Sequence, residues 1–124
     1  MKLKAVVLSL LAVFFVVTGA LAVNKADITK NVDTIVTAIE SGKDAAGYKA
    51  DEFDPYAFIM KEDGTMVVHP SLSGESLKEK APPIYSALLQ ASTEGVWLEY
   101  EWKGKTKHTY AKRTKDNLIV GSGY

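Results

Sequence analysis

Two residues near the C-terminal end of the sequence, Tyr110 and Lys112, have the types and the spacing to bind a negatively charged ligand. They lie two positions apart in an alternating run, Thr106–Arg113, so both side chains should leave the same face of a sheet. The ammonium group supplies charge to a carboxylate, and the phenol hydroxyl supplies a directed hydrogen bond. The competing interpretation is that Lys112 extends to solvent, as most lysines do.

A histidine, His69, has a backbone position that the sequence itself restricts. It follows an apolar run, Thr65–Val68, and precedes Pro70, which biases the residue before it toward an extended conformation. An imidazole held there can contact a pocket or only form hydrogen bonds at the strand end, and the residues leave both interpretations open. The second histidine, His108, lies beside a lysine-rich turn, and we expect it to be exposed.

The aromatic run Val96–Trp102 adds a third group of candidates. Strict alternation places Trp97 on the opposite face from Tyr100 and Trp102. Core packing is the default for Tyr100 and Trp102, because large aromatic side chains dominate protein cores. Trp97 stands beside two glutamates on its face, so it is either half exposed or lines a cavity, and it is the better pocket candidate.

Antiparallel strands and two helices must position these side chains. Apolar residues at helical spacing predict a four-turn amphipathic helix from Asp27 to a stop at Ser41-Gly42; they are Ile28, Val32, Ile35, Val36 and Ile39. Asp63-Gly64 predicts a hairpin turn between Tyr56–Met60 and Thr65–Val68.

The second half of the chain continues with a short helical connection and three strands. Ser76 begins a capping box, and Pro83–Ser92 is predicted to be a helix. The predicted strands that follow are Val96–Trp102, Thr106–Arg113 and Leu118–Val120. Strands joined as hairpins, with the helices apart from them, indicate an α+β fold built on an antiparallel sheet.

The N-terminal segment has the layout of a secretory signal peptide. Lys2 and Lys4 precede a long apolar stretch, and Ala20-Leu21-Ala22 forms a small-x-small cleavage site. We expect residues 1–22 to be a signal peptide and residues 23–124 to be a single domain, secreted or periplasmic. The alternative is an uncleaved membrane anchor over residues 5–23, which is nearly long enough to cross a bilayer.

Composition excludes several classes of function. The chain has no cysteine, so disulfides, thiolate zinc sites, iron–sulfur clusters and c-type haem attachment are ruled out. The chain has 15 basic and 15 acidic residues, and removal of Lys2 and Lys4 leaves a small acidic excess. It therefore lacks the excess of basic residues that nucleic-acid binding requires. No catalytic or metal motif has recognisable spacing, so we predict neither enzyme activity nor a cofactor.

Four segments in order resemble an extracytoplasmic single Cache domain, the PAS-like sensor module of bacterial chemoreceptors and histidine kinases. They are EDGTMVVHP (Glu62–Pro70), GVWLEYEW (Gly95–Trp102), TYAKR (Thr109–Arg113) and GSGY (Gly121–Tyr124). The resemblance covers roughly Ile28 to Tyr124. It implies a five-stranded antiparallel sheet with the long N-terminal helix on one face and a short helical connection between strands 2 and 3.

The resemblance also implies a function and a site. Similar domains bind short organic acids or other small metabolites in a cavity on the face away from the long helix. Carried over by position, the ligand-binding residues are Tyr56, Phe58, His69, Trp97, Tyr100, Tyr110 and Lys112. On this basis Tyr56 and His69 should face Trp97, Tyr110 and Lys112 across the sheet.

One feature departs from the family pattern. Family members usually continue into a transmembrane helix and a cytoplasmic signalling domain, whereas this sequence ends at Tyr124. The expectation is therefore a free-standing periplasmic sensor that acts in signal transduction. The alternative is a ligand-free scaffold that docks on a membrane receptor or histidine kinase, or forms a homodimer through its N-terminal helix.

Overall fold

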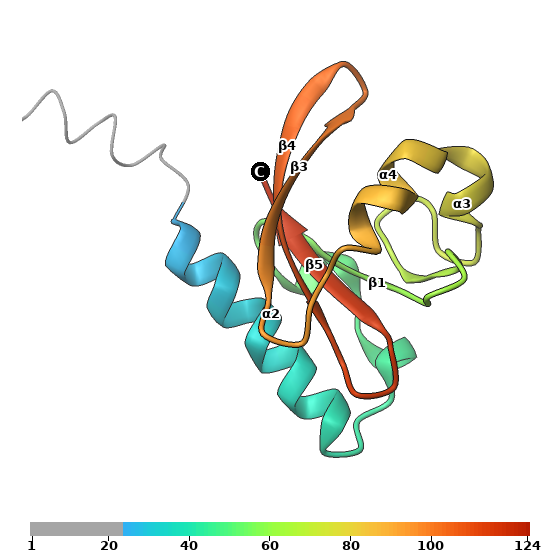
Figure 1. Ribbon diagram of the computed structural model, residues 1–124. Coiled ribbons are helices and arrows are strands. Elements are labelled where there is room, and N and C mark those ends of the chain that lie inside the picture. Colours follow the sequence, from blue (N-terminus) through green and yellow to red (C-terminus); the bar gives the residue numbers. More distant parts are fainter. Residues whose placement is uncertain (1–23) are drawn as a thin grey trace, which may run out of the picture.

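The computed structural model describes residues 24–124, which form one sheet with a helical layer on each face (Figure 1). The predicted signal peptide or anchor lies outside the described residues. Within residues 24–124 no helix is both long enough and apolar enough to cross a membrane.

The sheet has five antiparallel strands in the spatial order β2-β1-β5-β4-β3. The strands are β1 (Ala57–Met60), β2 (Met66–Val68), β3 (Val96–Trp102), β4 (Lys105–Arg113) and β5 (Ile119–Gly123). This arrangement confirms the predicted α+β, PAS-like fold. Strand β5 runs three residues beyond its predicted end at Val120, so the GSG segment is part of the sheet.

The long helix α2 (Lys25–Glu40) covers one face of the sheet (Figure 1). It begins two residues before the predicted start, because the Asn24 side chain accepts hydrogen bonds from the backbone N–H groups of Ala26 and Asp27. Its apolar stripe is buried as predicted: Ile28, Val32, Ile35 and Val36 are at most 4% exposed. The outward side of α2 is polar, with Lys30, Thr34 and Thr37 exposed.

The opposite face is covered by two short helices, α3 (Leu77–Lys80) and α4 (Pro82–Leu88) (Figure 1). Ser76 caps α3 as predicted, by accepting a hydrogen bond from the Glu79 backbone N–H. The predicted helix over 83–92 ends earlier, at Leu88. The carbonyls of Leu89 and Ala91 instead turn toward Arg113 of β4, whose guanidinium donates to both.

Strands β1 and β2 form the first hairpin of the sheet. Gly64 makes its turn with φ +98°, and an added Cβ there would press against Lys78. Strand β1 is buried on both faces, as is β5, so these two strands form the centre of the sheet. The segment between α2 and β1 contains two short 3₁₀ turns, Ala45–Gly47 and Ala50–Glu52.

Candidate functional site

A small cavity lies between the sheet and the α3–α4 segment. The centre of a water molecule can occupy about 20 Å³ of it, so the cavity has room for roughly one water. Its wall is built from every strand except β5 and from both short helices. The lining side chains are Tyr56, Phe58, Met66, His69, Leu77, Ile84, Leu88, Tyr100, Trp102 and Lys107.

Strand β5 does not line the cavity, but a glycine on it leaves room for one of the lining side chains, Phe58. Phe58 on β1 lies over Gly121 of β5, and an added Cβ at Gly121 would collide with the phenyl ring. Glycine at this position therefore lets the Phe58 ring lie flat against the sheet. This is a close approach that only a residue without a side chain allows.

Lys107 of β4 brings a positive charge to the cavity. Its ammonium nitrogen lies 5.1 Å from the centre of the Tyr56 ring, within cation–π distance. Partial burial lowers the pKa of Lys107, because the charged form loses hydration. Among residues 24–124 no carboxylate lies within ion-pair distance of this lysine.

His69 stands at the end of β2, where Pro70 follows it. Its ring packs edge-on against Tyr56 and Trp102, with centroid distances of 5.6 and 6.1 Å. Burial lowers the pKa of His69, and the charges of Lys103 and Lys107 lower it further. The histidine side chain is therefore neutral at pH 7.

Tyr100 lies deeper on the same wall. Its hydroxyl forms a hydrogen bond of 2.9 Å with the hydroxyl of the fully buried Thr109. Burial raises the pKa of Tyr100 to about 12, so the phenol is protonated over any physiological pH. The polar groups of the cavity wall are thus a lysine ammonium, a neutral imidazole and neutral phenols.

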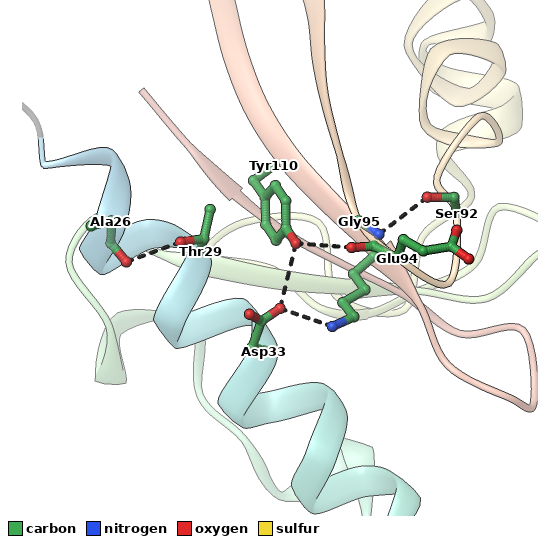
Figure 2. A network of polar contacts seen from close by, with 8 residues as sticks. Ala26, Thr29, Asp33, Ser92, Glu94, Gly95 and Tyr110 are labelled. Carbon is green, nitrogen blue, oxygen red and sulfur yellow. Dashed lines mark hydrogen bonds and ion pairs between the residues drawn. The ribbon is translucent and has the colours of Figure 1, made fainter.

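The other three predicted site residues lie on the opposite face of the sheet, so the expectation of one shared site was wrong. Lys112 points toward α2, where its ammonium forms an ion pair with Asp33 at 3.0 Å. The Tyr110 hydroxyl lies 3.5 Å from the same carboxylate and donates to the Glu94 carbonyl at 3.3 Å (Figure 2). Burial and the negative charge of Asp33 raise the pKa of Tyr110.

Trp97 belongs to this second face as well. Its ring contacts those of Tyr110 and Tyr124, and the Lys25 ammonium of α2 lies 5.3 Å from its centre. It is therefore packed between the sheet and the start of α2, and it does not line the cavity. His69 and Lys112 are on different faces, so they do not point toward each other.

The alternation of residues along β3 and β4 was predicted correctly, but the assignment of its faces was not. The sequence places Lys107 opposite Lys112, and Tyr100 opposite Trp97, as the structure does. The resemblance placed Trp97, Tyr110 and Lys112 on the face away from the long helix, whereas all three lie on the face that meets α2. Asp33 is not part of the apolar stripe of α2, yet its carboxylate reaches Lys112, a contact that the spacing of apolar residues does not predict.

Residues 24–124 contain no group of three or more histidine or acidic side chains close enough to hold a metal ion. His108 is half exposed, stacked on Tyr124 and 3.2 Å from the Glu99 carboxylate. It lies on the α2 side of the sheet, away from the cavity.

The architecture is similar to that of a solved methyl-accepting chemotaxis protein from Vibrio parahaemolyticus. The TM-score is 0.53 with 17% sequence identity, over 81% of this chain and 86% of that chain. No protein-family model matches the sequence, and no curated protein matches it. At this identity, the likeness shows that the two chains share a fold.

Proposed function

We propose that this chain is a sensory module that binds a short organic acid, or a similar small carboxylate, in the cavity beneath α3 and α4. The main support is Lys107, whose ammonium is partly buried and has no carboxylate partner in residues 24–124. The fold shared with a chemotaxis protein supports a role in signalling.

The chemistry of the wall favours an anion over a cation. The charged lysine has lost hydration, and a bound carboxylate would supply the missing counter-charge together with a charge-assisted hydrogen bond. Apolar side chains of Phe58, Leu77 and Leu88 line the rest of the cavity, which suits a short alkyl group. Binding, rather than catalysis, is the activity that this set of groups supports.

The size of the cavity requires a rearrangement on binding. With room for about one water, even an acetate-sized ligand must displace the Lys107 side chain or shift the α3–α4 segment. Such a shift is how a ligand could change the surface that the module presents to a signalling partner. We place this activity in the periplasm, on the basis of the signal-peptide pattern in residues 1–22.

The small cavity also favours a second candidate. Bulky aromatic side chains line the cavity and room for only about one water remains, as expected of a ligand-free scaffold that keeps the sensor fold and docks on a membrane receptor or histidine kinase. A homodimer through α2 would need the polar outward side of that helix, because its apolar side is buried against the sheet.

A ligand screen separates the two candidates. The predicted domain, residues 23–124, contains both hydrophobic cores and is heated with a panel of short mono- and dicarboxylates and 2-oxo acids. A ligand present at a hundred times its dissociation constant stabilises the native state by about 2.7 kcal/mol, a readily measured rise in melting temperature. If no member of the panel raises the melting temperature at millimolar concentration, the scaffold replaces the sensor as the proposed function.

Two lysine variants then test the site. Lys107→Met keeps the aliphatic stem and removes the charge, so the dissociation constant measured by calorimetry should rise at least tenfold. Lys105→Met is the matched control, because Lys105 is on the same strand and the same face but is exposed at the hairpin tip. Equal affinities for both variants would remove Lys107 from the site.

A further inference from the structure

The two ring nitrogens of His69 have different roles in the structure. Nδ1 accepts hydrogen bonds from the backbone N–H groups of Ser71 and Leu72, both at 3.0 Å. A nitrogen that accepts two donors presents its lone pair to them and carries no proton. In the neutral ring the proton is therefore on Nε2, and the loop after β2 fixes that tautomer.

Nε2 is left available for another molecule. It forms no hydrogen bond with residues 24–124, and it lies across the ring from the loop that holds Nδ1. The ring stands between Tyr56 and Trp102, and all three side chains line the cavity. The ring that carries the free N–H therefore lines the same cavity as Lys107.

The surroundings keep this ring neutral. The charged groups near it are the ammonium groups of Lys103 and Lys107, and both lower the pKa of His69. Tyr56 is uncharged, because burial raises the pKa of its hydroxyl. Protonation at Nδ1 would also replace an acceptor by a donor facing two backbone N–H groups, which breaks the loop's hydrogen bonds.

We propose that His69 is a specificity-determining residue that donates its Nε2 proton to an acceptor oxygen of the ligand, beside the ammonium of Lys107. This inference rests on the proposed binding function. One ligand oxygen accepts from the Nε2–H of His69 and a second accepts from the ammonium of Lys107. The site accordingly selects ligands with two acceptor oxygens close together, such as carboxylates and 2-oxo acids. It rejects alkyl ammonium ions, which offer only donors and a positive charge.

The natural amide residues separate the two roles of the ring. In His69→Asn the side-chain oxygen takes the place of Nδ1 and can accept from Ser71 and Leu72, but no donor reaches the position of Nε2. In His69→Gln an amide N–H can reach the position of Nε2, while the acceptor for the loop is lost. We expect the Asn variant to keep the melting temperature within a few degrees and to bind the carboxylate found in the screen at least tenfold more weakly.

The Gln variant should show the reverse pattern, with lower stability and an affinity closer to that of the unaltered protein. Carboxylate affinity that is unchanged in the Asn variant would overturn the proposal, although binding itself would stand.

A spectroscopic measurement tests the tautomer without any ligand. In a ¹⁵N-labelled sample the chain's two histidines are distinguished with a His108→Gln variant. The His69 ring should show a protonated Nε2 and an unprotonated Nδ1 at neutral pH. A proton on Nδ1, or rapid exchange between both tautomers, would overturn the inference even if every carboxylate failed to bind.

Discussion

Two of the three lysines of strand β4, Lys107 and Lys112, lie five residues apart in environments that differ completely. Lys112 faces α2 and is neutralised by Asp33, with its side chain 23% exposed. Lys107 faces α3 and α4, is partly buried against Tyr56, and has no carboxylate partner in the described part of the chain. Two residues of the same type on one strand therefore have a structural role on one face and a candidate binding role on the other.

The difference extends to the two layers as a whole. On the α2 face a four-turn helix packs fully buried side chains against Ile59 and Val120, and a polar contact to Asp33 ties the helix to β4 (Figure 2). On the other face two short helices leave a small cavity with polar groups in its wall. Both faces of the sheet thus carry a buried core, but only the α3–α4 face also encloses a cavity with polar groups in its wall.

The largest expected effect comes from the packed face. Ile35 of α2 is fully buried against the sheet, so Ile35→Ala should lower the free energy of unfolding, measured by urea titration, by about 2–5 kcal/mol. The matched change on the cavity face is Ile84→Ala. It should cost less, because Ile84 already borders unfilled space and retains slight exposure. A larger loss at Ile84 would contradict the distinction between the two layers.

Lowering the pH should destabilise the protein through His69, which lines the cavity. The pKa of His69 is lowered from its usual value of 6.5, so the native state binds fewer protons than the unfolded chain in the pH range between the native pKa and 6.5. The contribution of His69 to stability is complete above about pH 6.5 and is lost as the pH falls through the native pKa. The slope is at most about 1.4 kcal/mol per pH unit.

Urea titrations of the unaltered protein and of His69→Asn between pH 7.5 and 5 check this dependence. The variant should lack the part of the slope that comes from His69. Identical slopes would show that the ring is not responsible.

The smallest expected effect is the ion pair on the α2 face. A double-mutant cycle with Asp33→Asn and Lys112→Met should give a coupling of roughly 0.2–1 kcal/mol, since Asp33 is 47% exposed and the pair is screened by solvent. The coupling should fall as salt is added. Neither change should alter carboxylate affinity, and a large loss of binding in Lys112→Met would restore the role first expected for that lysine.

Local features of the fold could be predicted from the sequence because each depends on neighbouring residues. The turn at Gly64, the cap at Ser76 and the apolar stripe of α2 are all set within a few positions. The end of α4 could not be predicted, because it depends on Arg113, which lies more than twenty residues away and draws the carbonyls of Leu89 and Ala91 out of the helix.

The candidate site was predicted in part for the same reason. Tyr56, Phe58, His69 and Tyr100 line the cavity, whereas Trp97, Tyr110 and Lys112 lie against α2. Alternation fixes which residues share a face, but only the packing of the helices determines which face is hollow. Lys107 was overlooked because it is one of several lysines around a hairpin turn, and its contact with the ring of Tyr56, which precedes β1, depends on residues far apart in the sequence.

The positions of the two tryptophans allow the two faces to be observed separately by fluorescence. Trp102 lines the cavity and Trp97 packs near the start of α2, and the chain contains no other tryptophan. Trp97→Phe would leave an emission signal that reports on the cavity, and Trp102→Phe one that reports on the helix interface. A ligand that changes only the first signal stays local, whereas a change in both would show that its binding is transmitted through the sheet to α2.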